Sequence, residues 1–271
     1  MARKRFVVPL TVAGSDPSGG AGLQADLKVF LRYGLSGAAV CTATTVQSPT
    51  GMAAVNPVAA PIVTAQLATL LRDMRPAAVK VGLLGSGDTV RAVARALLPL
   101  SRRGVPIVVD PVLTAGDGTR LLPKADVPLL QRHLFPLATL VTPNLAEAAE
   151  LAGVDEDRVR GKTDDVVRTL LRSGCRNVLV KGGHMDSDEA VDVLGVRSGE
   201  LVLFSAARVP RRTNVHGTGC ALSAAITALL AVGRSLEDAV QGGKAFVTAA
   251  IEGAQTIGRG SRQLDFLTKL E

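Results

Sequence analysis

The chain has 271 residues, of which 47% are hydrophobic and 20% are charged, a balance that excludes an intrinsically disordered protein. Its net charge of +7 would suit a nucleic-acid-binding protein, but aromatic residues make up only 3% and the basic residues are dispersed. We therefore expect no nucleic-acid partner and interpret the positive charge as an attraction for anionic substrates.

The cysteine content and the hydropathy pattern indicate in which cellular compartment the protein works. Three cysteines at wide spacing predict neither a disulfide framework nor a zinc site, and they favour a reducing cytoplasm. The basic start lacks the long apolar region of a signal peptide. The longest apolar stretch, 221–232, is shorter than the roughly 18 residues that indicate a membrane span. The sequence therefore predicts a cytoplasmic protein without a membrane partner.

Strand-like and helix-like segments alternate along the whole chain. In chain order we expect strand 6–13, helix 20–33, strand 36–46, helix 61–73, strand 78–81, helix 88–103, strand 106–109, helix 124–134, strand 139–141, helices 145–151 and 164–173, strand 177–180, a hairpin of 191–194 with 200–209, helix 221–232 and a last helix from Ser235. This alternation predicts a mostly parallel sheet with helices on both faces and the small β-hairpin beside it. We expect one domain over 1–271, with its core at about 6–257.

A glycine-rich loop at 216–220 precedes the apolar helix 221–232. Gly217, Thr218 and Gly219 bring backbone N–H groups to a helix N-terminus, where the amides have no internal partners and the macrodipole is positive. This pattern predicts an anion hole suited to phosphate. The same field would favour the ionised form of Cys220, which could then accept a proton from a hydroxyl. The alternative is a tight entry into a buried helix, with Cys220 as a small core residue.

Two other glycine motifs are incomplete. The segment 20–25 matches the dinucleotide fingerprint G-x-G-x-x-A, but the chain has no acidic residue between Leu27 and Arg72 to hold a ribose. Gly161-Lys162-Thr163 resembles the end of a phosphate-binding P-loop, although no strand precedes it. We therefore expect neither site.

Polar residues follow several predicted strands, where open parallel sheets bind ligands. They are Asp16, Gln47, Asp110, Asn144, Glu147 and Lys181. Two acids and an amide suit Mg²⁺, and a lysine suits a phosphoryl group in transfer. Each also has a structural explanation, because Asn144 with Glu147 forms a capping box signature and the others occupy turns or strand exits. His184 and His216 are interpreted as hydrogen-bonding loop residues.

Asp26 borders an apolar helix stripe that contains Leu23, Leu27 and Phe30. A carboxylate in that position needs a partner. We expect a substrate amine or ring nitrogen to provide it.

Together, these segments resemble a known family. The segments 14–22 with 24–26, 142–144 with Glu147, 181–184 and 216–220 are similar in order and composition to the bacterial hydroxymethylpyrimidine/phosphomethylpyrimidine kinases of thiamine biosynthesis. Those enzymes have the ribokinase-like fold, a three-layer α/β sandwich. The resemblance covers about 7–257. It implies that ATP phosphorylates 4-amino-5-hydroxymethyl-2-methylpyrimidine and then the resulting monophosphate, with Mg²⁺.

The resemblance also implies roles for individual residues and a homodimer, because relatives are commonly dimers. The pyrimidine is expected at Asp26, Gln47, Gly14, Leu83 and Val112. The anion hole is expected at Gly217, Thr218 and Gly219, with Cys220 as base and Lys181 as a phosphate contact. ATP is expected at Asn144, Thr213, Lys244, Gly217 and Gly219, and Mg²⁺ at Asp110 and Glu147.

Three observations bear on rival functions. Gln47 favours the pyrimidine over pyridoxal, because related pyridoxal kinases often have a hydrophobic residue there. Leu83 replaces a common methionine, a volume-conserving change. The segment 258–262 departs from the usual ending of the family, so no role is assigned to the C-terminal tail. A pyridoxal or pyridoxamine kinase remains open, as does a non-enzymatic pyrimidine sensor or nucleic-acid binder with this fold.

Overall fold

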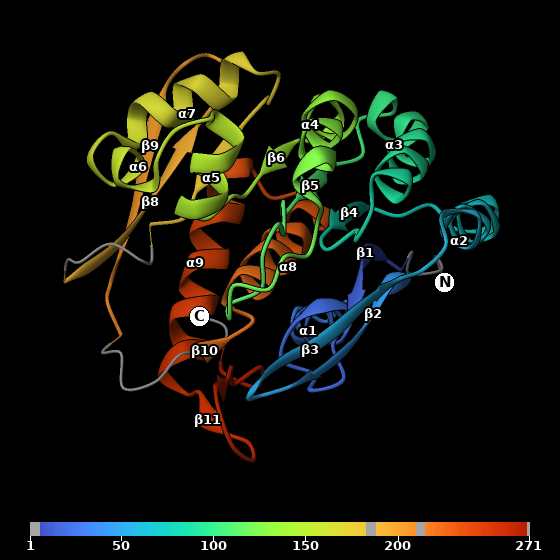
Figure 1. Cartoon of the computed structure of the whole chain (residues 1–271), viewed down its shortest axis with the longest axis horizontal. Coiled ribbons are helices and arrows are strands. Elements are labelled where there is room, and N and C mark those ends of the chain that lie inside the picture. Colours follow the sequence, from blue (N-terminus) through green and yellow to red (C-terminus); the bar gives the residue numbers. More distant parts are fainter. Residues whose placement is uncertain (1–5, 183–187, 210–214, 270–271) are drawn as a thin grey trace, which may run out of the picture.

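The computed structural model describes residues 6–182, 188–209 and 215–269. A nine-stranded sheet passes through the middle of the described chain, in the order β3-β2-β1-β4-β5-β6-β7-β8-β9 (Figure 1). Helices cover both of its faces. The expected α/β architecture with a large, mostly parallel central sheet is therefore confirmed.

The sheet consists of a parallel centre with antiparallel strands at both edges. The parallel strands are β2 (Ala38–Ser48), β1 (Pro9–Ser15), β4 (Ala78–Val81), β5 (Ile107–Val109), β6 (Leu140–Val141) and β7 (Val178–Val180). The antiparallel strands are β3 (Gly51–Pro57), β8 (Glu189–Gly195) and β9 (Leu201–Ala207). The expected hairpin is confirmed as β8 and β9, and it extends the main sheet because β8 pairs with β7. β3 was not predicted, since it lacks regular alternation and forms a half-exposed edge.

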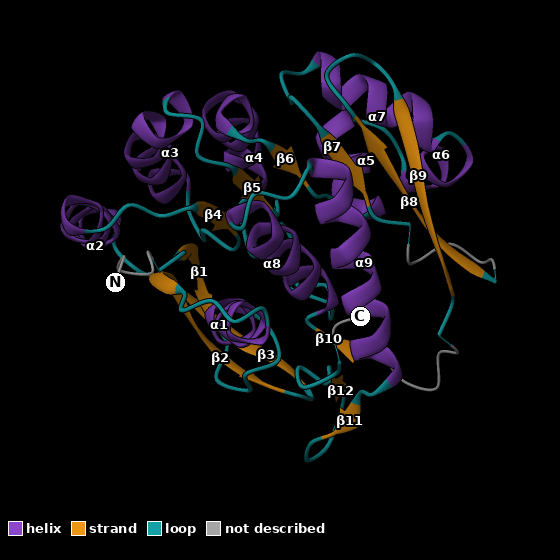
Figure 2. Ribbon diagram, turned by 180° about the vertical axis from the view of Figure 1, so that it is seen from behind, coloured by secondary structure: helices purple, strands orange, loops and turns teal. Residues whose placement is uncertain are grey.

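One face of the sheet is covered by three helices, α1 (Gly22–Arg32), α8 (Thr218–Ala231) and α9 (Leu236–Glu252) (Figure 2). α8 is apolar nearly all round, and it packs between the sheet and its two neighbours. It begins three residues before the expected 221, so the glycine-rich loop forms its first turn. α9 begins as predicted, with the Ser235 side chain accepting a hydrogen bond from the amide of Asp238 at 3.1 Å.

The opposite face carries the remaining helices. They are α2 (Ala60–Asp73), α3 (Gly87–Arg102), α4 (Val127–Leu129), α5 (Leu145–Ala152), α6 (Glu156–Gly161) and α7 (Thr163–Arg172). The continuous helix expected at 124–134 is wrong: residues 124–137 form a series of short 3-10, α and π turns. Pro128 and Pro136 explain this irregularity, because proline lacks the amide that a continuous helix needs. Gly161 ends the unpredicted α6, so the P-loop-like motif joins two helices.

The order of the strands creates a place for a ligand. The chain moves from β1 to β2 on one side and later returns to β4 on the other side of β1. The loops after β1 and β4 therefore separate at the carboxyl edge of the sheet. Ligands bind at such switch points in open parallel sheets.

A second, three-stranded sheet joins the C-terminal tail to this edge. β10 (Val215–His216) pairs in parallel with β12 (Arg262–Gln263), which pairs with β11 (Gln255–Thr256). Leu264 is 5% exposed and packs in the core with α1, α8 and α9. The expected core limit near 257 is therefore too early, because the following residues contribute buried contacts.

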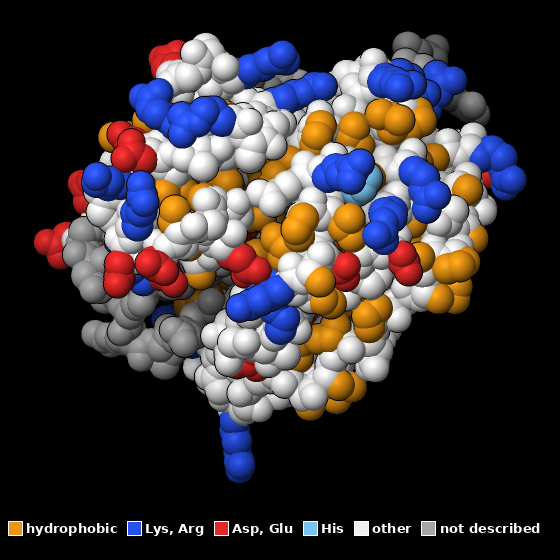
Figure 3. Space-filling model, turned by 45° about the horizontal axis from the view of Figure 1, so that its top comes forward, with side chains coloured by type: hydrophobic (Ala, Val, Ile, Leu, Met, Phe, Trp, Pro, Cys, Tyr) orange, Lys and Arg blue, Asp and Glu red, His pale blue; other side chains and the backbone are white. Residues whose placement is uncertain are grey.

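The molecular surface agrees with the dispersed charge in the sequence. On the face shown in Figure 3, Lys and Arg side chains are scattered and acidic side chains lie among them. Within the described ranges, every helix is too short or too polar to cross a bilayer.

Candidate active site

A cavity of about 960 Å³ lies at the carboxyl edge of the parallel strands. The loops after β1, β4, β5, β6 and β7 line it, together with the first turn of α8. The structure brings together 13 of the predicted site residues in its wall: Gly14, Gln47, Leu83, Asp110, Val112, Asn144, Glu147, Lys181, Gly217, Thr218, Gly219, Cys220 and Lys244. Asp26 is absent from this lining, and Thr213 lies outside the described residues.

The first turn of α8 has the form expected of an anion hole. Gly217 adopts φ +84°, and a Cβ there would lie 1.8 Å from the carbonyl oxygen of Gly20, so only glycine fits. No described residue accepts a hydrogen bond from the amides of Thr218, Gly219 or Cys220. Three backbone donors at the positive end of a 14-residue helix are therefore available to an anion.

Lys181 and Asp110 lie directly beside this turn. Lys181 Nζ donates a hydrogen bond to Asp110 Oδ1 at 2.9 Å, and the Ser223 hydroxyl donates to Asp110 Oδ2 at 3.2 Å. A Cβ on Gly219 would lie 3.2 Å from Lys181 Nζ. Burial alone would raise the pKa of Asp110, but Lys181 and Lys80 outweigh it and lower the pKa. The aspartate is thus ionised and the ammonium of Lys181 borders the anion hole.

Asn144 and Glu147 form the capping box of α5 while facing the same cavity. The Asn144 side chain accepts from the Glu147 amide at 2.9 Å, and Glu147 Oε2 accepts from the Asn144 amide at 2.8 Å. Burial raises the pKa of Glu147 to about 7, with the charge of Asp110 raising it and Lys181 opposing both. The structural and functional interpretations of this pair are therefore compatible.

The same two carboxylates meet the needs of Mg²⁺. The described residues contain no group of three metal-ligating side chains. Mg²⁺ usually takes one or two protein carboxylates and completes its shell with phosphate oxygens and water. Asp110 and Glu147, buried at 2% and 4% exposure, fit this requirement, and the electrostatic repulsion between them is what a divalent cation would relieve.

The predicted ionisation of Cys220 is wrong for the free protein. Burial raises the pKa of the thiol, the negative charges of Asp110 and Asp26 add to this effect, and Lys80 opposes it. Desolvation and the two carboxylates thus oppose the effect expected from the helix N-terminus. Cys220 nevertheless lines the cavity, one residue after Gly219.

Asp26 does not have the predicted partner. It is fully buried, with its two carboxylate oxygens 2.7 and 2.8 Å from Lys80 Nζ, and the Thr11 hydroxyl donates to it at 2.6 Å. A substrate amine is not needed to satisfy it. The sequence offered a signal for this pair, since Lys80 lies within a buried four-residue strand and a buried charge must be paired.

Lys244 is also engaged by an aspartate. Its Nζ lies 2.8 Å from Asp192 Oδ2, and Asp192 Oδ1 accepts from the Gly182 amide at 2.8 Å. Lys244 is 6% exposed, so this ion pair is an internal part of the wall. It fixes the backbone that follows Lys181, at the end of the cavity expected to hold the nucleotide.

The opposite end of the cavity combines an apolar surface with one amide. Leu83, Val112 and Gly14 line it, and a Cβ on Gly14 would lie 2.7 Å from Leu83 Cδ2. Gln47 lines the same cavity, and its amide lies 2.9 Å from His216 Nε2. Glycine at 14 thus lets the Leu83 side chain pack directly against the backbone of β1.

Two residues here have roles that the sequence did not reveal. His216 Nε2 is 2.9 Å from Asp16 Oδ2, so the histidine connects the first loop of the chain with Gln47. Gln263, from the unassigned tail, donates to the carbonyl of Ser18 at 2.8 Å. These contacts join segments more than 160 residues apart, for which no local pattern exists.

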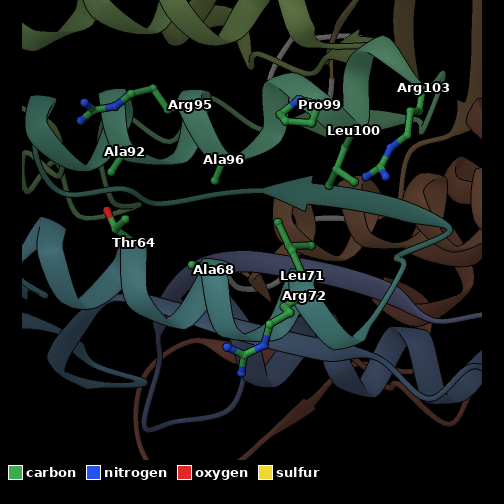
Figure 4. A pocket seen from close by; sticks show the side chains of 10 residues that line it. All are labelled: Thr64, Ala68, Leu71, Arg72, Ala92, Arg95, Ala96, Pro99, Leu100 and Arg103. Carbon is green, nitrogen blue, oxygen red and sulfur yellow. The ribbon is translucent and has the colours of Figure 1, made fainter.

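A separate groove of about 630 Å³ lies between α2 and α3. Figure 4 shows its alanine and leucine side chains between the helices, with Arg95 and Arg72 on opposite helices and their guanidinium groups apart. It shares no residue with the large cavity. Its arginines do not converge on a common point, unlike the polar groups around Lys181.

Comparison with known proteins gives a consistent result. Residues 16–265 match the family model described as phosphomethylpyrimidine kinase. The chain is 44% identical over 258 residues to the hydroxymethylpyrimidine/phosphomethylpyrimidine kinase of Rhizobium meliloti, covering 93% of this chain and 94% of that protein. It is 41% identical over 265 residues to the thiamine biosynthesis bifunctional protein ThiED of Geobacter sulfurreducens, covering 97% of this chain but only 52%, about half, of that longer protein.

The structural comparison agrees. An ADP complex of Bacillus subtilis pyridoxal kinase superposes with a TM-score of 0.87 at 30% identity, over 97% of this chain and 98% of the other.

Proposed function

The chain belongs to the phosphomethylpyrimidine kinase family, and we propose on this premise that it catalyses two successive phosphoryl transfers from ATP. The first acceptor is the hydroxymethyl group of 4-amino-5-hydroxymethyl-2-methylpyrimidine. The second is the monophosphate formed in that step, which becomes the pyrophosphate used in thiamine biosynthesis. The chain is a kinase, and nucleotide complexes of related structures support ATP as the donor.

One observation carries this proposal: a single cavity holds a phosphate-binding end and a ring-binding end. The phosphate end has the amides of the α8 turn, which no described residue pairs with, and the ammonium of Lys181. The ring end has Leu83, Val112 and the amide of Gln47. A phosphorylatable group on a small aromatic ring would thus lie between its binding surface and the anion hole.

Each end has a defined part in transfer. Lys181 and the amides of Gly219 and Cys220 receive the migrating phosphoryl group and stabilise its charge. Asp110 and Glu147 would hold Mg²⁺, which would neutralise phosphate charge. The Asp192–Lys244 pair keeps the strand exit at Gly182 in place, and this fixes the position of Lys181.

Cys220 accepts the hydroxyl proton in the first transfer. Because burial raises the pKa of its thiol, the active thiolate becomes more abundant as the pH rises, and the first transfer should accelerate through the alkaline range. The second acceptor is a phosphate monoester that is already ionised near neutral pH, so it needs no base. Cys220→Ala should therefore slow the first transfer at least about tenfold more than the second. Equal losses in both steps would contradict the base assignment.

A coupled ATPase assay tests the function as a whole. The acceptors are the free pyrimidine, its monophosphate and pyridoxal, each with and without Mg²⁺. We expect turnover on both pyrimidines, dependence on Mg²⁺ and weak turnover on pyridoxal. Pyridoxal as the preferred acceptor would instead support the activity of the structurally similar kinase.

Three further expectations belong to this proposal. The described cysteines, Cys41, Cys175 and Cys220, are free thiols, which supports a reducing cytoplasm. We expect a single kinase domain, since the nine-stranded sheet and its covering helices include most of the described elements and the small second sheet packs at the edge of the same cavity. It forms a homodimer, which sedimentation analysis would measure directly.

A further inference from the structure

We propose that Asp16 and His216 act as a positioning pair that fixes the orientation of the Gln47 amide, so that Gln47 offers an N–H donor to a ring nitrogen of the substrate. The inference rests on the proposed function and adds a specificity determinant to it. Its basis is a chain of hydrogen bonds that allows only one arrangement of protons. Gln47 contacts the substrate in this proposal, whereas His216 and Asp16 act through Gln47.

The first link is Asp16, which can only accept hydrogen bonds. Asp16 is 2% exposed, and its carboxylate accepts from the Ser18 amide at 2.9 Å, the Ser18 hydroxyl at 2.8 Å and the Ala21 amide at 2.8 Å. Burial raises the pKa of Asp16, but the hydrogen bonds from His216 and Ser18 outweigh burial and lower it. A saturated, ionised carboxylate has no proton to donate. His216 Nε2, 2.9 Å from Asp16 Oδ2, must therefore carry the hydrogen.

The second link is the contact between His216 and Gln47. The amide atom of Gln47 that lies 2.9 Å from His216 Nε2 is assigned as Nε2, which would place two N–H donors against each other. The imidazole nitrogen already bears a hydrogen and has no lone pair to accept another. The amide must consequently present its oxygen, which shares the Nε2 hydrogen with Asp16. The oxygen and nitrogen of an amide are assigned by such hydrogen bonds, since their shapes are alike.

Thr45 is compatible with this orientation. Its hydroxyl lies 3.0 Å from the carbonyl oxygen of Ser15 and 3.3 Å from the amide atom of Gln47 assigned as Oε1, and its single hydrogen can go to only one of them. When the hydroxyl donates to Ser15, the closer acceptor, it can still accept a hydrogen bond from an NH₂ group of Gln47. The contact with His216 therefore sets the amide orientation, and Thr45 accommodates the nitrogen end.

This arrangement leaves one hydrogen-bond donor for the substrate. One N–H of Gln47 points to Thr45, and the second remains for the cavity that Gln47 lines with Leu83 and Val112. An unprotonated nitrogen in a heteroaromatic ring is the complementary acceptor. The chain of contacts also explains Gly20, where a Cβ would lie 2.7 Å from His216 Cδ2 and would displace the imidazole.

The test is a double-mutant cycle of His216 and Gln47, measured as kcat and KM for the free pyrimidine and for ATP. His216→Ala should raise the pyrimidine KM about tenfold or more while leaving the ATP KM within about twofold. In a Gln47→Ala background the same His216→Ala change should have no further effect on the pyrimidine KM. His216→Gln, which keeps an N–H donor near the Nε2 position, should restore the KM to within about threefold of the unchanged protein.

Additive effects of the two substitutions would overturn the proposal, because His216 would then act independently of Gln47. An equal rise in the KM of ATP would also overturn it, since this indicates general damage to the cavity. Failure of His216→Gln to recover affinity would count against the donor role. If the unchanged protein does not phosphorylate the pyrimidine at all, the proposed function fails. The double-mutant cycle is then measured with pyrimidine dissociation constants from calorimetry in place of KM.

Discussion

Replacing Glu147 by glutamine should stabilise the metal-free protein at neutral and alkaline pH. The carboxyl is 4% exposed, and burial raises its pKa from 4.5 to about 7. Below pH 4.5 the group is protonated in both folded and unfolded chains and does not affect folding. Between pH 4.5 and 7 the unfolded chain releases the proton while the folded chain retains it, so stability falls as the pH rises. At about 1.4 kcal/mol for each pH unit, the loss reaches about 3 kcal/mol and stays constant above pH 7.

Urea unfolding with EDTA, from pH 5 to pH 8.5, measures this difference. Glutamine keeps an oxygen for the Asn144 amide but carries no charge, so the advantage of Glu147→Gln should grow up to pH 7 and then level off. Glu150→Gln in the same helix is a control of opposite sign. Hydrogen bonds from Arg120 lower the pKa of Glu150, so its contribution is present at neutral pH and is lost on acidification. A difference for Glu147→Gln that is independent of pH would refute the electrostatic account of this site.

Three further predictions follow from the packing. Gly219→Ala should change the melting temperature by no more than a few degrees but reduce kcat about a hundredfold, because the methyl group would enter the space beside Lys181. Gly217→Ala should lower the melting temperature as well as kcat, because it also strains the backbone. Asp26→Asn should cost about 3–5 kcal/mol of unfolding free energy by leaving Lys80 buried and unpaired, and adding Lys80→Met should recover much of that loss in urea unfolding. Gln263→Ala should cost about 1–2 kcal/mol and raise the pyrimidine KM with little change in the ATP KM, because it releases the loop that holds Asp16. The first prediction would be contradicted by an unchanged kcat for Gly219→Ala. The second would be contradicted if the losses from Asp26→Asn and Lys80→Met were additive, and the third if Gln263→Ala left the pyrimidine KM unaltered.

Local patterns were sufficient for most of the sheet and for the cavity wall. The short apolar runs predicted β4 at its observed bounds, and the polar residues after β5, β6 and β7 lie together because parallel strands end at one edge. The same rule grouped Asp110, Glu147 and Lys181 without any knowledge of their distances. Where a residue follows a strand, its place in the chain therefore predicts its place in the fold.

The errors concern contacts that depend on distant partners. A substrate amine was expected to pair with Asp26 on α1, and Lys80, which pairs with it in the structure, lies 54 residues later on β4. Cys220 was expected to be ionised because the helix terminus is visible in the sequence, whereas the desolvation that raises its pKa depends on the whole core. Both properties depend on how distant segments pack together, and the residues around one position in the sequence do not reveal that packing.

The contacts of the C-terminal tail affect when the cavity can form during synthesis of the chain. β12 follows every other segment that lines the cavity, yet it pairs with His216, and Gln263 ties down the loop after β1. A nascent polypeptide that has formed its sheet but has not yet released β12 from the ribosome would hold an unfinished pocket. Substrate recognition should thus arise only after β12 is free to fold, when Gln263 contacts the loop that was synthesised 245 residues earlier.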